Sequence, residues 1–178
     1  MIAGLGDRVP RLAASAFVAP TAIVVGDVVL GEDSSVWYGA VLRGDIAGIR
    51  IGDRTNIQDH CMLHTSTGGP DAVVGSDVTV GHRAVIHGAT VQDRCLIGMG
   101  AILLVRCVIG EESLVAAGSV VLEDLVVPPR SFVAGVPAKI RGPIPPDALD
   151  GLREAARIYV RLAREHAATI AAAGGART

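Results

Sequence analysis

Aromatic side chains are scarce in this sequence. Phe, Trp and Tyr make up only 3% of its 178 residues, although half of the chain is hydrophobic. Valine, isoleucine, alanine and glycine carry the apolar content instead. Such small and β-branched residues suit closely stacked strands better than a helical core. The length fits one domain that can bury a core of its own.

Three further absences narrow the function. No run of Lys and Arg occurs and the formal net charge is −2, which disfavours nucleic acid as a partner. No apolar run is long enough to span a membrane, and none stands at a secretion-type N-terminus. The three cysteines form no Cys-x-x-Cys pair, which fits free thiols in a reducing compartment. We therefore expect a cytoplasmic protein that binds neither nucleic acid nor membrane.

An aliphatic residue recurs every six positions along most of the chain. This period matches neither an α-helix nor a long alternating strand. It is typical of short strands joined by corners, with the aliphatic residue pointing into a narrow prism. With three offsets, the step is kept by Val18, Val24, Leu30, Val36, Leu42, Ile51, Ile57, Leu63, Val74, Val80, Ile86, Val91, Ile97, Leu103, Ile109, Val115 and Val121.

Three such hexads make one triangular coil, and the repeat predicts about six stacked coils whose inward side chains form ladders. The repeat should stop near Pro128–Pro129. The period does not give the hand of the coil, and general crossover rules favour a right-handed one. The predicted coils begin at Val18, Val36, Ile57, Val80, Ile97 and Val115.

The C-terminal part of the chain has a different pattern. Residues 134–139 indicate a turn, and a proline-rich stretch precedes a segment whose apolar residues recur on one helical face. We predict a hexapeptide-repeat domain over residues 12–140, an α-helix over 145–171 that packs on it, and a flexible tail at 172–178.

Histidines gather in the middle of the repeat. In the coil grouping, Arg43, His64 and His87 each follow the second hexad position of successive coils. They should therefore stack on one outward ladder, roughly 4.8 Å apart from coil to coil. Asp59 and His82 each follow a first hexad position by two residues, so they should stack on a different ladder.

His64 and His87 can converge on one metal ion from one chain, but His82 is harder to bring to it. It stands five residues before His87, so the two side chains face opposite ways in a strand, roughly 16 Å apart at the backbone. Imidazole–metal bonds are only about 2.0–2.1 Å long, so the third ligand is better supplied by a second chain. Such a contact can close into a ring. We predict a homotrimer with metal sites at its subunit interfaces.

Three imidazoles leave one metal position open for water, which is the pattern of a catalytic zinc site. The metal would lower the pKa of that water towards neutrality. Arg43 could pair with Asp45 or with Asp59 at the interface, and Gln58 could hydrogen-bond the water or a substrate oxygen.

The motifs that carry this reading are Arg43-Gly44-Asp45, Thr55-Asn56-Ile57-Gln58-Asp59, His64, Val80-Gly81-His82, His87-Gly88 and Ile97-Gly98-Met99-Gly100-Ala101. Together they resemble the γ-class carbonic anhydrase-like family over roughly residues 12–166. The resemblance implies an all-β solenoid, a left-handed parallel β-helix with a C-terminal α-helix, and reversible hydration of CO2 to bicarbonate. It implies Zn²⁺, or else Fe²⁺ or Co²⁺, held by His64, His82 and His87, with catalytic roles for Arg43, Asp45, Gln58, Asp59 and Tyr159.

The sequence departs from the best-characterised active members in two places. Ile46 follows the Arg-Gly-Asp motif and residues 65–71 hold no glutamate, so the acidic insertion that shuttles protons in those members has no counterpart. Their helix asparagine is also missing, and Arg161 lies nearby. These departures bear on catalytic rate more than on metal binding.

Each candidate residue also has a structural reading. The three histidines could be interface residues without metal, and Arg43, Asp45 and Asp59 could form an intersubunit ion-pair network. Further structural roles are packing for Tyr159, a small buried filler for Cys61, a structural role for His60 and a solvent-facing position for His166.

Three other functions remain open. Hexapeptide β-helices commonly carry acyltransferase activity that uses an acyl-coenzyme A and one histidine as base. The same metal site could serve another hydrolysis, such as thioester cleavage. A metal-stabilised trimer without turnover is the non-enzymatic alternative, and metal stoichiometry together with turnover would separate the three.

Overall fold

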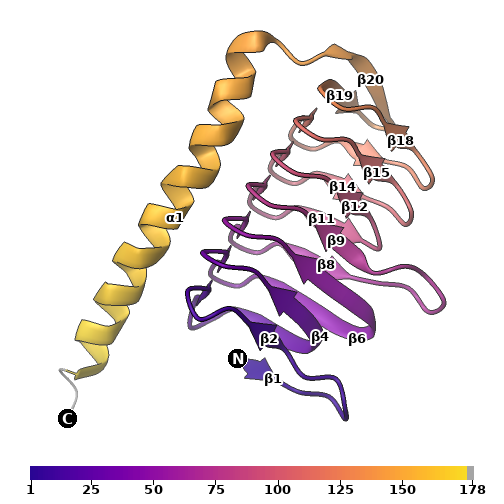
Figure 1. Ribbon diagram of the computed structural model, residues 1–178. Coiled ribbons are helices and arrows are strands. Elements are labelled where there is room, and N and C mark those ends of the chain that lie inside the picture. The colour runs from indigo at the N-terminus through magenta and orange to yellow at the C-terminus, as the bar shows by residue number, and fades with distance from the viewer. Residues whose placement is uncertain (176–178) are drawn as a thin grey trace.

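The computed structural model describes residues 1–175. The chain winds into a tapering stack of coils, and one long helix, α1 (Pro146–Gly175), runs beside the stack (Figure 1). Strands of successive coils pair in parallel. The predicted left-handed parallel β-helix with a C-terminal α-helix is confirmed.

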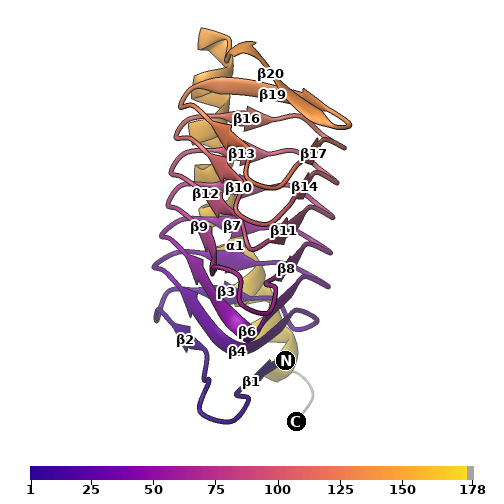
Figure 2. The ribbon, with the colours of Figure 1, turned by 90° about the vertical axis from the view of Figure 1, so that its right-hand side faces the viewer.

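The coils contribute strands to three faces of a triangular prism (Figure 2). Face 1 is an eight-stranded sheet. Its strands are β3 (Phe17–Val18), β5 (Ser35–Val36), β7 (Asn56–Ile57), β10 (Thr79–Val80), β13 (Leu96–Ile97), β16 (Leu114–Val115), β19 (Ser131–Gly135) and β20 (Ala138–Pro143). Strands β3 to β19 of this face mark coils 1 to 7, and β20 folds back on β19 as an antiparallel hairpin at the predicted turn.

Faces 2 and 3 share two long strands, β4 (Ile23–Leu30) and β6 (Val41–Ile51), which join them into one sheet. Face 2 continues with β8 (Met62–His64), β11 (Val85–His87), β14 (Ile102–Leu103) and β17 (Val120–Val121). Face 3 continues with β9 (Ala72–Val74), β12 (Thr90–Val91), β15 (Val108–Ile109) and β18 (Val126–Val127). At the N-terminal end, β1 (Ile2–Ala3) and β2 (Arg11–Leu12) pair with β4.

Aliphatic ladders fill the prism. Every predicted inward residue from Val24 to Val121 is buried, and Val18 at the end of the stack is half-buried. Burying one such side chain contributes about 1.5–3 kcal/mol. The ladders are therefore the main source of stability, and they hold each outward residue in a fixed register.

The stack is one coil longer than the sequence predicts. Val127 and Val133 keep the six-residue step and are buried, so the repeat continues past Pro128–Pro129. The expected end was wrong because the two prolines stand at a corner, between β18 and β19, where no strand hydrogen bond is needed.

Two corners of the prism differ in their side chains. At the charged corner, between faces 3 and 1, acidic and basic residues alternate from coil to coil, all with φ between 53° and 59°. The charged corner consists of Asp33, Arg54, Asp77, Arg94, Glu112 and Arg130. At the histidine corner, between faces 1 and 2, residues with positive φ follow an outward side chain. The histidine corner consists of Tyr38–Gly39, Asp59–His60, His82–Arg83, Met99–Gly100 and Ala117–Gly118.

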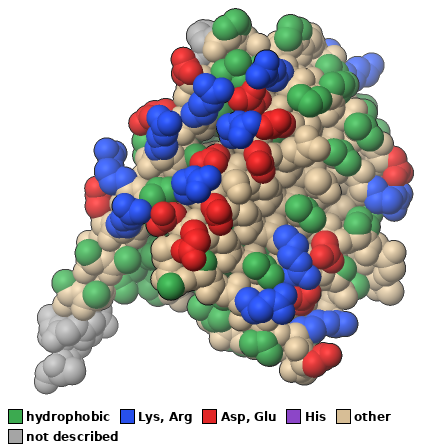
Figure 3. All heavy atoms as spheres, viewed as in Figure 1, with side chains coloured by type: hydrophobic (Ala, Val, Ile, Leu, Met, Phe, Trp, Pro, Cys, Tyr) green, Lys and Arg blue, Asp and Glu red, His purple; other side chains and the backbone are tan. Residues whose placement is uncertain are grey.

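Helix α1 lies along face 1 and contacts both corners. Arg153 donates to Glu112 at 2.8 Å and Arg164 donates to Asp33 at 3.1 Å. Acidic and basic side chains accordingly gather in a band where α1 meets the coils (Figure 3). The helix extends through residues 172–175, which the sequence places in a tail, and residues 176–178 of that tail lie outside the described residues. Over residues 1–175, the structure holds no helix that is apolar enough to cross a membrane.

His166 does not face solvent as its sequence position suggests. Its Nδ1 is 2.9 Å from the Tyr38 hydroxyl, and its ring lies 5.0 Å from the ring of Trp37. The expectation was wrong because the face of α1 that carries His166 meets an aromatic cluster around coils 1 and 2, which no local pattern in the helix reveals.

Candidate metal centre

One group of predicted site residues lies at the edge of face 2. The strands β8 and β11 place His64 directly beside His87, and β6 aligns Leu42 with Leu63, so Arg43 precedes them in the same ladder. The predicted stacking is therefore confirmed. The two imidazole rings are 5.3 Å apart and tilted by 49°. We call Arg43, Asp45, His64 and His87 the face-2 half-site.

Close contact between two coils explains the glycine in the Arg-Gly-Asp motif. A Cβ atom on Gly44 would lie 2.5 Å from the backbone oxygen of Asp27. The two coils can therefore approach this closely only with glycine at this position. The next residue, Asp45, forms an ion pair with Arg43, and its Oδ1 lies 2.9 Å from His64 Nε2.

The charges of the face-2 half-site are coupled. Burial opposes ionisation of Asp45, but hydrogen bonds from Arg43 and His64 outweigh it and lower the pKa of its carboxyl. Burial, together with the charges of His64 and Arg43, lowers the pKa of His87. His87 Nε2 also lies 2.8 Å from the hydroxyl of Ser66.

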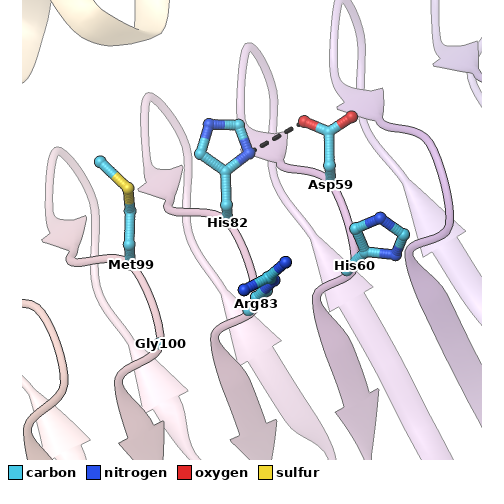
Figure 4. A pocket seen from close by; sticks show the side chains of 6 residues that line it. All are labelled: Asp59, His60, His82, Arg83, Met99 and Gly100. Atoms are coloured by element: carbon cyan, nitrogen blue, oxygen red, sulfur yellow. Dashed lines mark ion pairs between the residues drawn. The ribbon is translucent and has the colours of Figure 1, made fainter.

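A second group of predicted residues lies at the histidine corner. The pairing of β7 with β10 places Asp59 beside His82 as predicted, and His82 Nδ1 is 2.9 Å from Asp59 Oδ2 (Figure 4). This contact leaves Nε2 of His82 as the ring nitrogen without a partner among the described residues. His82 is also more exposed than His64, at 41% against 13% of the side chain.

Gln58 and Tyr159 stand behind His82. Gln58 is buried, its oxygen accepts the backbone N–H of His82 at 3.2 Å, and its amide donates to Asn56 at 3.1 Å. The ring of Tyr159, from α1, stacks edge-on against Trp37 at 5.2 Å, and burial raises the pKa of its hydroxyl. We call Gln58, Asp59 and His82 the corner half-site, with Tyr159 facing it across a groove.

The two half-sites do not meet within one chain. Among residues 1–175, no three His, Cys, Asp or Glu side chains are placed to hold one metal ion. His82 lies at the histidine corner before β11 begins, whereas His87 is the last residue of β11 and lies at the far edge of face 2. Each half-site nevertheless offers imidazole nitrogens to an ion, so the residues fit a metal whose ligands come from two protomers.

Curated proteins with similar sequences decide the family. The chain is 42% identical to the carbonic anhydrase of Geobacillus kaustophilus, over 90% of this chain and 87% of that protein. It is also 42% identical to mitochondrial γ carbonic anhydrase 2 of Arabidopsis thaliana over 90% of its own length. The chain belongs to the γ-class carbonic anhydrase family. It spans about 60% of the length of the Arabidopsis protein, and no family model matches it.

A solved structure extends the family likeness to the fold. A Bacillus cereus protein described as an acetyltransferase superposes with a TM-score of 0.90 at 36% identity, covering 93% of this chain and 95% of that one. The γ carbonic anhydrase family assigned by sequence therefore shares its solenoid with proteins that are named for acyl transfer.

Two further residues lie at these half-sites without a role predicted from the sequence. Ser66 reaches His87 from an irregular loop that interrupts the repeat, so no register places it. Met99 follows His82 by one coil and lines a pocket of about 510 Å³ at the histidine corner (Figure 4). The coil grouping could have found Met99, because it occupies the same position in the next coil. Cys61 is buried, as its predicted filler role requires.

Proposed function

We propose that this protein is a metal-dependent carbonic anhydrase that works as a homotrimer. In each of three sites, the face-2 half-site of one protomer meets the corner half-site of the next. The observation that carries the proposal is the position of the half-sites at opposite edges of one face, which suits a head-to-tail ring. We assign the trimer to the cytoplasm, where its three free cysteines stay reduced.

His64 and His87 of one protomer and His82 of the next would hold Zn²⁺, with Fe²⁺ or Co²⁺ as alternatives. Such an ion supplies hydroxide at neutral pH, because it lowers the pKa of a bound water to about 7. Asp59 accepts the hydrogen bond of His82 Nδ1 and so turns Nε2 outward as a ligand. Gln58 fixes the backbone of His82 at the same corner.

The substrate is CO2, and the product is bicarbonate with one proton. Arg43 and Asp45 neutralise each other at the edge of the face-2 half-site, and Asp45 also contacts His64 and so orients its ring. The chain has no acidic residue in loop 65–70, and the proton passes to bulk buffer or to a nearby side chain. Tyr159 packs against Trp37 and closes the rear of the site.

Mixed trimers test the shared site. One variant, His82→Ala, keeps an intact face-2 half-site; a second, His64→Ala with His87→Ala, keeps an intact corner half-site. Each variant alone should lose CO2 hydration in stopped-flow measurements. Random mixing should restore about a quarter of wild-type turnover and metal content, because every mixed ring holds one intact site of three.

The controls separate a failed site from a failed ring. Each variant must remain a trimer by light scattering, and a mixture of one variant with itself must stay inactive. Mixing that restores neither metal nor turnover would contradict a site built from two protomers. Metal without turnover in the wild-type trimer would leave a metal-stabilised assembly instead of an anhydrase.

Acyl transfer is the second candidate, and the Bacillus cereus neighbour described as an acetyltransferase favours it. That reaction needs one histidine as base and no three-histidine metal site. Acetyl-coenzyme A turnover that survives complete removal of metal would support acyl transfer. Turnover of CO2 that follows metal content would support the anhydrase.

A further inference from the structure

A groove between α1 and face 1 opens beside the corner half-site. It encloses about 450 Å³, which lies within the range of small-molecule sites. This volume is far larger than CO2 requires, and none of the steps described above uses it. The groove therefore needs an account of its own.

The lining of the groove changes along the solenoid axis. Gln58, Thr79 and His82 line it on coils 3 and 4, and Leu96 and Leu114 line it on coils 5 and 6. Two coil steps span about 10 Å. The groove is thus polar at the end that touches the corner half-site and apolar at the end that is farther away.

Small residues keep this space open. On α1 the wall is formed by Ala155 and, one turn further, by Tyr159, and on the solenoid the floor includes Gly98 and Ala117. A Cβ atom on Gly98 would lie 2.4 Å from the backbone nitrogen of Ala117, so a larger residue is excluded there. The gap is local, because Ala156 on the same helix is almost fully buried.

We propose that this groove binds the unbranched acyl chain of a carboxylic ester, with the ester carbonyl at the Gln58–His82 end. The inference rests on the proposed function for its activated water. No Asp, Glu, Lys or Arg lines the groove, which disfavours a ligand charged along its length. A polar end followed by a narrow apolar end fits a linear chain that carries one polar group.

The reaction at such an ester is hydrolysis. The oxygen of water forms a bond to the acyl carbon, and the bond between that carbon and the alkoxy oxygen breaks. One proton of the water leaves with the alcohol, and the acid remains as the carboxylate after losing the other. No oxidant or further co-reactant is required.

Binding can be measured without metal and without turnover. Trp37 is the single tryptophan of the chain, and its ring lies 5.2 Å from that of Tyr159, which lines the groove. Titration of metal-free protein with hexanoate should change the Trp37 fluorescence and saturate. Acetate should bind at least about tenfold more weakly, because it lacks the methylene groups that the apolar end buries.

Two leucine substitutions on α1 test the location. Ala155→Leu fills the groove and should weaken hexanoate binding at least about tenfold. The matched control, Ala168→Leu, adds the same side chain at an exposed position of the same helix and should bind as the wild type does. Leu114→Ser keeps the groove open but makes its apolar end polar, and it should also weaken hexanoate without affecting acetate.

Hydrolysis is then compared on the metal-loaded trimer. The kcat/KM for p-nitrophenyl hexanoate should exceed that for p-nitrophenyl acetate about tenfold in the wild type and in Ala168→Leu, and the preference should disappear in Ala155→Leu. No saturable hexanoate signal, or equal rates for both esters in the wild type, would overturn the inference. CO2 hydration is measured on the same preparation and tests the proposed function separately. Hydration without a chain-length preference would contradict only the acyl-chain groove. Hexanoate binding without hydration would contradict only the carbonic anhydrase activity.

Discussion

The charged corner and the histidine corner repeat the same backbone turn, yet they use it differently. Both place residues with positive φ at five or more successive coils, a conformation that costs an ordinary side chain roughly 1–2 kcal/mol. At the charged corner ion pairs offset that strain: Arg54 donates to Asp77 at 2.7 Å, and Glu112 accepts from Arg130 at 2.8 Å. At the histidine corner glycine relieves it at Gly39, Gly100 and Gly118.

The comparison shows how one solenoid separates stability from function. Side chains of the charged corner are turned towards one another and towards α1, so their hydrogen-bonding groups are occupied. At the histidine corner the outward residues Asp59 and His82 pair along the stack but leave one imidazole nitrogen for a ligand. Substitutions at the histidine corner should therefore lower activity and leave stability unchanged. Substitutions at the charged corner should lower stability and leave activity unchanged.

Among substitutions that keep all three histidines, Asp59→Asn should give the largest change in activity. Loss of the carboxylate that holds His82 Nδ1 should reduce metal affinity or CO2 turnover about 10- to 100-fold. The thermal midpoint should stay near the wild-type value because Asp59 is partly exposed. Metal content, stopped-flow rates and melting curves of the same preparation check this. A variant with a lowered thermal midpoint and full turnover would show that Asp59 stabilises the fold, as the charged corner does, and does not support the metal ligand.

Glu112→Gln should give the converse result. The pKa of Glu112 is lowered to about 2 by hydrogen bonds from Arg153, Arg130 and Arg94. Although Glu112 is buried, its arginine partners are exposed, so we expect a loss of about 2 kcal/mol in unfolding free energy with CO2 turnover retained. Urea unfolding measures it. An unchanged midpoint would mean that the charged corner does not stabilise the stack.

The pH dependence of that loss has a defined sign. The folded-state pKa lies below the ordinary value of 4.5, so the charge of Glu112 stabilises the fold fully above about pH 4.5. The contribution is lost as pH falls from there towards 2. The difference between wild type and Glu112→Gln should be constant near neutrality and should shrink in acid. A difference that grew on acidification would contradict the pairing.

Tyr38→Phe probes the place where α1 reaches the histidine corner. It removes the hydrogen bond between the Tyr38 hydroxyl and His166 Nδ1 but keeps the aromatic packing. We expect a loss of about 1 kcal/mol and faster amide exchange in the last turns of α1, with little change in turnover. Hydrogen exchange followed by mass spectrometry measures both ends of the helix in one experiment. Equal exchange rates in the wild type and in Tyr38→Phe would show that the Tyr38–His166 hydrogen bond does not hold the end of α1.

The remaining corner of the prism, between faces 2 and 3, should respond least to substitution. Arg106 donates to Asp124 at 2.6 Å, but both side chains are more than half exposed, and exposed pairs contribute little. Asp124→Asn should leave the thermal midpoint and turnover unchanged within error. A clear shift would show that ion pairs at corners matter even without α1 to cover them.

The periodic parts of the molecule could be predicted from the sequence, and the irregular parts could not. Ladder positions follow from a six-residue step, so the sequence alone predicts the stacking of His64 on His87 and of Asp59 next to His82. The roles of these residues at a metal stay predictions. Periodicity also misled: a pair of prolines suggests the end of a repeat, but a corner tolerates them, and the stack continues to Val133.

The contacts of the helix and the loop escaped prediction for another reason. His166 is placed by a surface formed from coils far away in sequence, and Ser66 by a loop without a repeat. The choice between Asp45 and Asp59 as partner of Arg43 was likewise open, since both carboxylates neighbour the ladder. In the structure, Arg43 pairs with Asp45 of the same strand, and Asp59 contacts His82.

The ion pairs between α1 and the charged corner also relate the length of the helix to the number of coils beside it. Arg153 holds coil 6 through Glu112 and Arg164 holds coil 2 through Asp33. Eleven residues of helix rise about 16 Å, and four coil steps rise about 19 Å, so the two lengths match closely enough for long arginine side chains to bridge. A coil inserted between the two anchors would make the helix one coil step too short to reach both of them. Beyond the insertion, each side chain of the helix would meet a charge of the opposite sign. The number of coils in this part of the solenoid is therefore not free to drift by duplication.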